Sequence, residues 1–323
     1  MRAYWLRAGE ADTAFELREQ PIPVPGPHQV LLRMRAAGLN RGEFIAGHGL
    51  SKTGSCKPAG LEGAGEIIET GSGVTKFKPG QRVFGRLVGA FADYALMEAD
   101  QAMHMPASLH WEDAACVPVV YMTAHDMLMR QGNLRSGEWL FIAGVASGIG
   151  VASLQIGKAL GARVAGTSGS SDKLQQLEQL GLDLPLCMRE PDFHPHLMHA
   201  TAGQGVDLVV NTVGGSVFAE CIRSLGFQGR LATVGYLDGV LKAELDISAL
   251  HARRLKLFGV SNKMVDAAFR SDAAKAFNDE IVPLLAAEKI KPVVGRAYPL
   301  DSLAEAKAYM ESNQHLGKIV VQI

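Results

Sequence analysis

The chain has few cysteines, and no two of them form a C-x-x-C pair. Cys56, Cys116, Cys187 and Cys221 are scattered over 323 residues. The sequence therefore offers neither a disulfide framework nor a cysteine-rich zinc site. This cysteine usage is typical of a reducing compartment, and we expect a cytoplasmic protein.

Charge of one sign and long apolar runs are also lacking. The formal net charge is -1, so composition gives no electrostatic reason to expect nucleic acid or an anionic membrane as the main partner. No apolar run is long enough to cross a bilayer, and residues 1–7 lack the apolar core of a signal peptide. We expect no membrane insertion and no nucleic-acid binding.

Two sequence textures divide the chain, which is long enough for two domains. Up to about residue 110, short β-like runs alternate with Gly- and Pro-rich turns, which predicts a small, partly open β-barrel. From about residue 135, predicted strands (207–211, 229–234 and 255–260 among them) alternate with predicted helices. This alternation predicts an α/β fold with a parallel sheet covered by helices on both faces.

A glycine turn at residues 144–150 carries the clearest functional signal. An apolar strand (140–143) precedes Gly144, Gly148 and Gly150, and an amphipathic helix (151–160) and a second strand (162–167) follow. Such a unit places a pyrophosphate on a helix N-terminus, where free N–H groups and the helix dipole favour an anion. The spacing departs from G-x-G-x-x-G, so an ordinary tight turn is the alternative.

The end of the second strand bears on the choice of cofactor. NAD-binding units usually place a carboxylate there to accept from the ribose hydroxyls. This chain instead has Ser168 and Ser170, followed by the cation of Lys173, and we expect NADPH rather than NADH. Asp172 would weaken this preference if it faced the ribose. Residues 170–172 can also cap a helix predicted over 173–180.

Several segments together resemble a known superfamily: residues 36–40, 60–67, 74–83, 123–124, 144–150, 205–211 and 317–320. The chain resembles a medium-chain dehydrogenase/reductase of the zinc-free, quinone-oxidoreductase (ζ-crystallin-like) type. The resemblance implies a GroES-like β-barrel domain plus an inserted Rossmann doubly wound parallel-sheet domain. It divides the chain into 1–122 (GroES-like), 123–262 (Rossmann) and 263–323 (return to the first domain), and it implies a homodimer.

The same resemblance argues against a metal. Zinc-dependent relatives have Cys where this chain has Asn40, and His where it has Leu61. Zinc requires three or four nitrogen, sulfur or oxygen ligands, so we expect none here. A second candidate set is His194, His196 and His199, whose alternative role is the polar face of an exposed helix.

Without a Lewis acid, oxidation of an alcohol loses its main electrostatic aid. Conjugated hydride acceptors need less help, and our first expectation is NADPH-dependent reduction of a quinone. The second is reduction of an α,β-unsaturated carbonyl, including enoyl thioesters, and residues near Asn40, His48, Tyr236 and Met264 would decide between them. A third possibility from another class is an NADPH-binding redox sensor or structural protein with little turnover, because no proton donor is evident.

The resemblance also supplies site residues. Asn40 is the predicted catalytic residue, beside the nicotinamide, and its alternative role is to satisfy a local turn. Glu43 lies at an acidic position of the family and is expected to be structural. Thr123 is predicted to contact the nicotinamide amide unless it bonds to its own backbone. Arg189, next to Met188, is expected to contact the 2′-phosphate. The full predicted cofactor-binding set is Asn40, Thr123, Ala146, Ser147, Gly148, Ile149, Ser168, Ser170, Lys173, Arg189, Asn211, Val213, Gly235, Tyr236, Leu237, Val260, Ser261 and Asn313.

Overall fold

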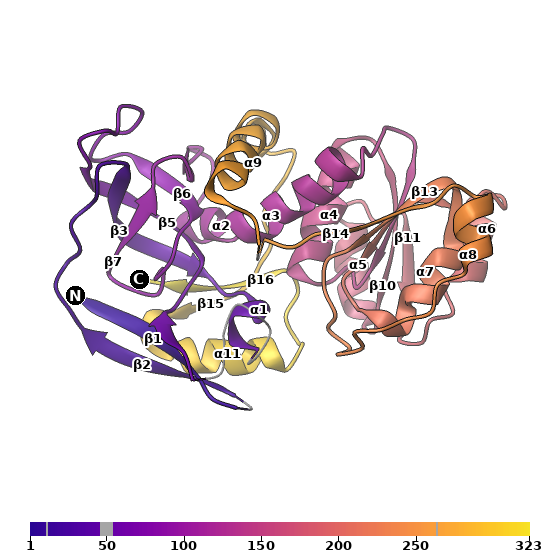
Figure 1. Ribbon diagram of the computed structural model, residues 1–323, viewed down its shortest axis with the longest axis horizontal. Helices are drawn as coiled ribbons and strands as arrows, with labels where there is room; N and C mark the ends of the chain where they lie inside the picture. The colour runs from indigo at the N-terminus through magenta and orange to yellow at the C-terminus, as the bar shows by residue number, and fades with distance from the viewer. Residues whose placement is uncertain (11, 46–53, 263) are drawn as a thin grey trace. The chain divides into compact units, whose positions relative to one another are not determined.

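The computed structural model describes residues 1–10, 12–45, 54–262 and 264–323 (Figure 1). They form two compact units. Unit 1 comprises Met1–Met122 and Lys263–Ile323, and unit 2 comprises Thr123–Asn262. Within the described ranges, no helix has the length and apolar character needed to span a membrane.

Unit 1 is built on two sheets. A seven-stranded sheet has the order β15-β16-β3-β5-β6-β8, with β7 also pairing to β3, and a three-stranded sheet has the order β2-β1-β4. The strands are β1 (Arg2–Ala8), β2 (Thr13–Glu19), β3 (Gln29–Gly38), β4 (Cys56–Pro58), β5 (Glu62–Thr70), β6 (Arg82–Arg86), β7 (Tyr94–Glu98), β8 (Ala102–His104), β15 (Val294–Pro299) and β16 (Lys318–Gln322). The helices are α1 (Arg41–Phe44), α2 (Trp111–Ala115), α9 (Ala267–Glu280), α10 (Val282–Ala286), the 3-10 turn η3 (Leu300–Ser302) and α11 (Leu303–Glu311).

Strand β3 is the centre of unit 1. It is antiparallel to β5, β7 and β16, so segments from both ends of the chain meet on it. Most of its side chains are buried, and Leu32 and Met34 lie in a core that also contains Ile67 of β5 and Val321 of β16. The C-terminal strand is thus an integral part of the domain that the N-terminal residues begin.

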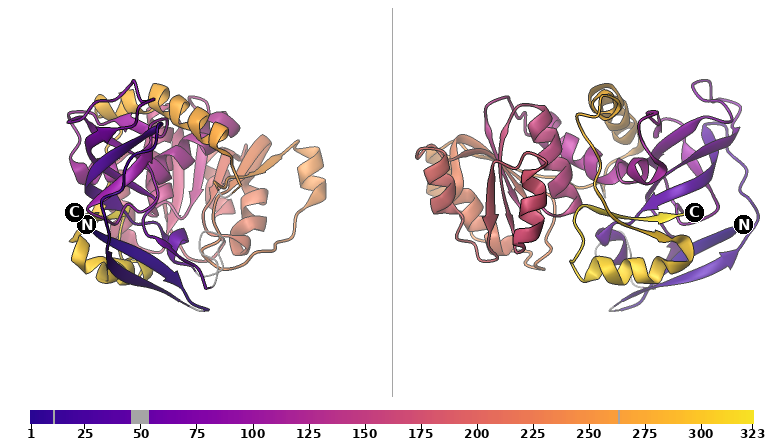
Figure 2. Two further views of the ribbon diagram at one scale, coloured as in Figure 1. Left: turned by 60° about the vertical axis from the view of Figure 1, so that its left-hand side comes forward. Right: turned by 180° about the vertical axis from the view of Figure 1, so that it is seen from behind.

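Unit 2 is a parallel sheet with the strand order β11-β10-β9-β12-β13-β14, and its helices flank both faces of the sheet (Figure 2). All five residues of the central strand β9 are buried, as expected for a strand covered on both sides. The strands are β9 (Trp139–Ala143), β10 (Arg163–Ser168), β11 (Leu184–Cys187), β12 (Val206–Asn211), β13 (Leu225–Thr233) and β14 (Lys256–Gly259). The helices are η1 (Asp126–Gln131), α4 (Gly148–Ala159), α5 (Ser171–Glu178), α6 (His194–Ala200), η2 (Gly215–Val217), α7 (Phe218–Ser224) and α8 (Ile247–Ala252); α3 (Pro118–His125) runs from unit 1 into unit 2.

The α/β class and the GroES-like and Rossmann architecture are confirmed, and several element boundaries differ from prediction. Helix α5 begins at Ser171 rather than 173, because the Ser170 hydroxyl accepts from Lys173 N and caps it. The chain after α3 continues as a π-helix, η1. Strand β13 begins four residues before the predicted 229. Strand β11 was not predicted, since its four residues include a proline and only one buried side chain.

Candidate functional site

Four polar side chains form a cluster in unit 1 in which Asn40 is half-buried and the other three are buried: Asn40, Glu43, Glu62 and Lys318, here called the Asn40 cluster. The Lys318 ammonium lies 2.7 Å from Glu62 Oε1 and donates to Asn40 Oδ1 at 2.8 Å. It also donates to the Leu39 carbonyl oxygen. All three of its N–H donors are therefore used inside the protein, as a buried ammonium requires.

The Asn40 amide is equally engaged. Its Nδ2 donates to Glu62 Oε1 at 2.9 Å and to Glu43 Oε1 at 3.2 Å, while its Oδ1 accepts from Lys318. The cation and the carboxylates fix which side of the amide carries oxygen and which nitrogen. In this arrangement Asn40 offers a ligand a lone pair of Oδ1, and neither of its N–H donors is free to polarise a carbonyl.

The fold brings these four groups together from distant segments. Asn40 precedes α1 without capping it through its side chain, Glu62 begins β5, and Lys318 begins β16. The second oxygen of Glu62 accepts from Val119 N of α3 at 2.7 Å. The sequence analysis did not identify Glu62 or Lys318 as site residues. One sequence feature could have identified them: a charged residue, Glu62 or Lys318, is the first residue of a mainly apolar strand.

Glu43 is the member of the cluster with a strongly shifted acidity. Burial raises the pKa of Glu43 to about 7, and the nearby Glu62 carboxylate acts in the same direction. Hydrogen bonds from Asn40 and from Gly60 N, the latter at 3.1 Å, oppose this shift only in part. The neutral form of Glu43 is therefore favoured up to near neutral pH, and Lys318 and Glu62 then balance each other.

In unit 2, the glycine turn joins the carboxyl end of β9 to the start of α4. A Cβ on Gly150 would lie 2.5 Å from the Gly144 carbonyl oxygen, so the first turn of α4 packs directly on the loop. Ser147 caps α4: its Oγ accepts from Gly150 N at 3.0 Å and donates to Gly144 O at 2.8 Å. Its single proton is used within the turn. Ala146, Gly148 and Ile149 surround it.

The predicted phosphate-selecting residues gather at the end of β10. The Arg189 side chain lies against Gly169, where an added Cβ would be 2.9 Å from its Cζ. Ser168 Oγ accepts from Ser170 N at 3.3 Å, and Ser170 caps α5. Desolvation lowers the pKa of Lys173, which follows directly. Two cations and two hydroxyls thus share one corner of unit 2.

The other predicted residues fall into two groups. Some already have structural partners: Asn211 is fully buried and its amide closes the turn to Gly214, Asn262 Nδ2 lies 3.4 Å from the Thr123 hydroxyl, and Asn313 Oδ1 accepts from Arg41 at 2.6 Å. The rest follow strands β12, β13 and β14 at their carboxyl ends, where doubly wound sheets bind ligands: Val213, Gly235, Tyr236, Leu237, Val260 and Ser261.

The histidine candidate for a metal site is not supported. Within the described ranges, no three or more His, Cys, Asp or Glu side chains are grouped so that they could hold a metal ion. The three histidines lie in the short helix α6, where His196 and His199, three residues apart, share one face and His194 lies on the opposite side. His48, named above for the shape of the substrate region, lies outside the described residues.

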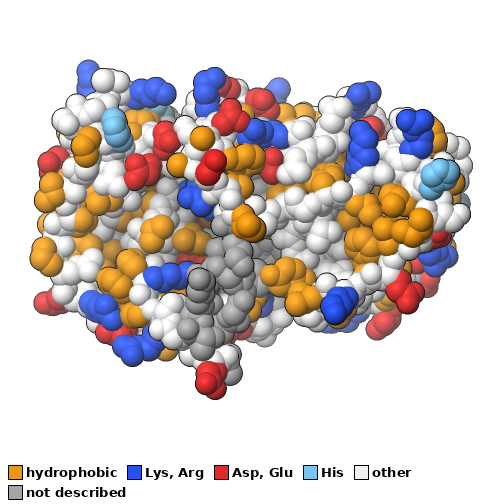
Figure 3. Space-filling model, in the orientation of Figure 1, with side chains coloured by type: hydrophobic (Ala, Val, Ile, Leu, Met, Phe, Trp, Pro, Cys, Tyr) orange, Lys and Arg blue, Asp and Glu red, His pale blue; other side chains and the backbone are white. Residues whose placement is uncertain are grey.

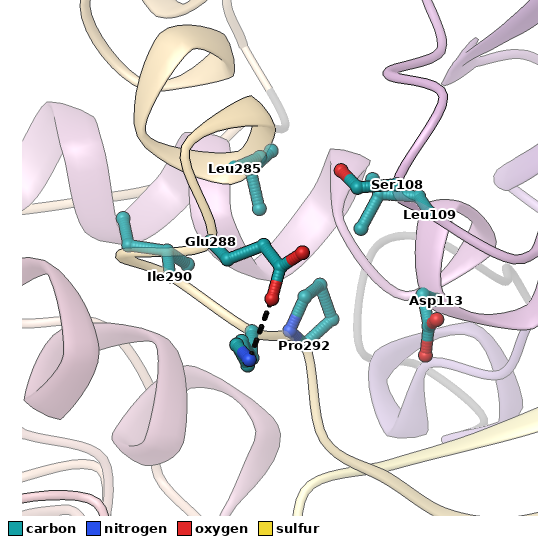
Figure 4. Close-up of a pocket in the computed structure, with 8 residues that line it drawn as sticks. Ser108, Leu109, Asp113, Leu285, Glu288, Ile290 and Pro292 are labelled. Atoms are coloured by element: carbon teal, nitrogen blue, oxygen red, sulfur yellow. Dashed lines mark ion pairs between the residues drawn. The ribbon is translucent and has the colours of Figure 1, made fainter.

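A cavity of about 300 Å³ in unit 1 contains none of the predicted site residues (Figure 4). It is lined by Ser108, Leu109, Asp113, Leu285, Glu288, Ile290, Lys291 and Pro292. Its lysine is paired with Glu288 at 2.8 Å. The chemistry of the chain therefore points to the Asn40 cluster and the glycine turn rather than to this cavity.

Glu43 gives a prediction for the dependence of stability on pH. The folded protein keeps a proton on Glu43 that the unfolded chain loses near its ordinary pKa, so the free energy of unfolding should fall as pH rises from about 4.5 to about 7. Glu43→Gln should remove this fall. Urea unfolding at about pH 5, 6 and 7 measures it. The exposed control Glu69→Gln should keep the wild-type slope; equal slopes in all three proteins would contradict the assignment.

Comparisons with known proteins agree with this geometry. The family described as "Alcohol dehydrogenase GroES-like domain" matches residues 26–107, and "Zinc-binding dehydrogenase" matches residues 180–321. A highly reducing polyketide synthase from Alternaria alternata is 31% identical over 98% of this chain. A phenolphthiocerol/phthiocerol polyketide synthase subunit from Mycobacterium tuberculosis is 30% identical over 93%. The chain spans only 12% and 14% of the lengths of these two relatives.

Solved structures extend the likeness over the full chain. A mycobacterial protein complexed with NADPH is 25% identical, with a TM-score of 0.88, and an NAD-dependent alcohol dehydrogenase is 27% identical, with a TM-score of 0.86; each match covers 100% of both chains. The NADPH complex supports the cofactor expected from residues 168–173. With its GroES-like segment, its parallel sheet and these full-length matches, the chain belongs to the medium-chain dehydrogenase/reductase superfamily.

Proposed function

We propose that the protein is an NADPH-dependent reductase of α,β-unsaturated carbonyl compounds, including enoyl thioesters, and that it acts without a metal. Bound NADPH would supply a hydride from nicotinamide C4. The hydride would add to the β-carbon of the acceptor and a solvent proton to the α-carbon, which would give the saturated carbonyl compound and NADP⁺. The relatedness to polyketide synthases favours this acceptor class over the quinone expected first.

The observation that carries the metal-free proposal is the Asn40 cluster. The family model that matches residues 180–321 is described as zinc-binding, but Asn40 and Leu61 stand where the resemblance places a Cys and a His of zinc-dependent relatives. Around Asn40 an internal cation, Lys318, already neutralises Glu62. These groups do not form a zinc ligand set, and the reaction is assigned no step through zinc.

The two units contribute different parts to the reaction. Unit 2 holds the dinucleotide through the glycine turn, with Lys173 and Arg189 binding the 2′-phosphate. Unit 1 contributes Asn40, whose free Oδ1 lone pair can orient an N–H or O–H donor, such as the amide of the nicotinamide. Its role is therefore to position the reactants rather than to protonate them.

Quinone reduction is the second candidate, because it uses the same hydride step. The Escherichia coli quinone oxidoreductase structure, which holds NADPH, matches with a TM-score of 0.87 at 24% identity. That likeness supports a shared fold, whereas the two polyketide synthases share more sequence. We therefore rank the enoyl acceptor first.

We further propose that the protein forms a homodimer through unit 2. Strand β14 is at the edge of the parallel sheet, and an edge strand leaves one row of N–H and C=O groups available for pairing. Phe227, near the start of the adjacent β13, is 66% exposed. Figure 3 shows hydrophobic side chains gathered over this part of unit 2. An apolar surface beside an unpaired edge fits a second copy of the chain.

The proposed reaction can be tested by following NADPH absorbance with three acceptors: a simple enone, an enoyl thioester and a benzoquinone. We expect turnover of the first two with kcat/KM at least about tenfold above that of the quinone. A preference for the quinone would reverse our ranking. Tight NADPH binding without turnover of any acceptor would favour a redox sensor.

The double variant Lys173→Ala/Arg189→Ala tests the phosphate-binding corner. Losing two charged partners of the 2′-phosphate should raise the Kd for NADPH at least about tenfold and leave the Kd for NADH almost unchanged. Quenching of protein fluorescence on titration measures both. Arg163→Ala, at the opposite end of β10, is the matched control. An equal loss for both cofactors would reject the assignment.

The dimer proposal predicts a mass of about twice the 34.5 kDa of one chain by light scattering. Phe227→Glu places a charge in the proposed apolar contact and should give the monomer mass. Val24→Glu, at a site in unit 1 that is 80% exposed, should leave the dimer intact. A wild-type protein with the mass of one chain would refute the proposal.

A further inference from the structure

Arg86, the last residue of β6, is a partly buried guanidinium near the Asn40 cluster. None of the residues described in the structure accepts a hydrogen bond from it or forms an ion pair with it. Arg82 on the same strand is different, because it donates to the Leu109 carbonyl oxygen at 2.8 Å and lies 4.6 Å from the Trp111 ring centroid. The guanidinium N–H groups of Arg86 thus have no hydrogen-bond acceptor among the described residues.

The strand pairing explains why Arg86 has no ion pair with the nearest carboxylate. In the antiparallel pairing of β5 and β6, it lies directly opposite Glu62. Both oxygens of Glu62 are already taken, Oε1 by Lys318 and Asn40 and Oε2 by Val119 N. The nearest carboxylate is therefore committed elsewhere, and Arg86 remains a cation at the border of the Asn40 cluster.

The charged groups around Arg86 act on its pKa in opposite directions. Desolvation is the main cause that lowers the pKa of Arg86, the cation of Arg270 on α9 lowers it further, and Glu62 and Glu43 raise it only in part. Lys318 balances Glu62, and the neutral form of Glu43 is favoured up to near pH 7. Within the described ranges, Arg86 therefore has charged neighbours of both signs but no carboxylate that forms an ion pair with it.

We infer that Arg86 is a specificity-determining residue that binds an anionic oxygen, of a carboxylate or a phosphate, on the molecule that is reduced. A guanidinium presents a planar array of N–H donors that matches both anions. A bound anion would give these donors the acceptors that no residue in the described ranges provides. The inference rests on the proposed function for the hydride step, and it adds a charged group to the expected acceptor.

Two pairs of acceptors separate the possible sources of the anion. Cinnamaldehyde and 4-carboxycinnamaldehyde differ by a carboxylate. Crotonyl-pantetheine and crotonyl-4′-phosphopantetheine differ by a phosphate. In Arg86→Gln, we expect KM for the charged member of at least one pair to rise about tenfold or more, with kcat nearly unchanged and the neutral member unaffected. Arg86→Lys should restore part of the loss.

Arg33→Gln, on the exposed side of β3, is the matched control and should behave as wild type. Equal changes for the charged and neutral members of both pairs, or no change in any of them, would overturn the inference. Correct folding of Arg86→Gln is verified by a midpoint of urea unfolding that matches the wild-type value, because Arg86 belongs to unit 1.

A binding measurement separates this inference from the proposed function. If the wild-type protein oxidises NADPH with none of the four acceptors, the proposed function fails. Calorimetric titration of the NADP⁺-loaded protein with 4-carboxycinnamaldehyde and with 4′-phosphopantetheine still tests Arg86. The inference stands if wild type binds one of them and Arg86→Gln binds it at least about tenfold more weakly. It fails if wild type binds neither or if both proteins bind equally.

Discussion

The buried contact between Lys318 and Glu62 is the interaction on which unit 1 depends. It joins the C-terminal strand β16 to β5, and its two members also hold the Asn40 amide and the backbone of α3. Removing either partner would leave an uncompensated charge in a region almost without solvent, which typically costs several kcal/mol. The same ion pair therefore joins β16 to the rest of unit 1 and fixes the orientation of the Asn40 amide.

In unit 2, neutral hydrogen-bonding groups hold the glycine turn in place. Its glycine turn must keep backbone N–H groups oriented at the start of α4 whether or not an anion is present. Ser147 does this by satisfying both Gly150 N and Gly144 O with one hydroxyl. The loop shape is then set before the cofactor arrives, which reduces the entropy lost on binding. In our proposal, the side chains at the end of β10 discriminate between NADPH and NADH.

The sequence predicted the parts of the molecule that depend on local pattern. The alternation of strands and helices, the glycine turn and the serine cap of α5 all follow from residues close together in the chain. It did not predict that the Asn40 donors are engaged, because the partner Lys318 is 278 residues away and only the folded sheet brings them together. The burial that raises the pKa of Glu43 is also a property of packing, and so is the lack of an acceptor for Arg86 among the residues that the structure describes.

The split of unit 1 between the two ends of the chain has a consequence for synthesis on the ribosome. Residues 123–262 are continuous and can form their sheet as soon as they emerge. The first 122 residues cannot reach their final state then, because β3 lacks its neighbour β16 and Glu62 lacks the Lys318 ammonium. The later unit therefore matures first, and the earlier one waits for the last strand while its sheet edge is exposed to chaperones and to aggregation.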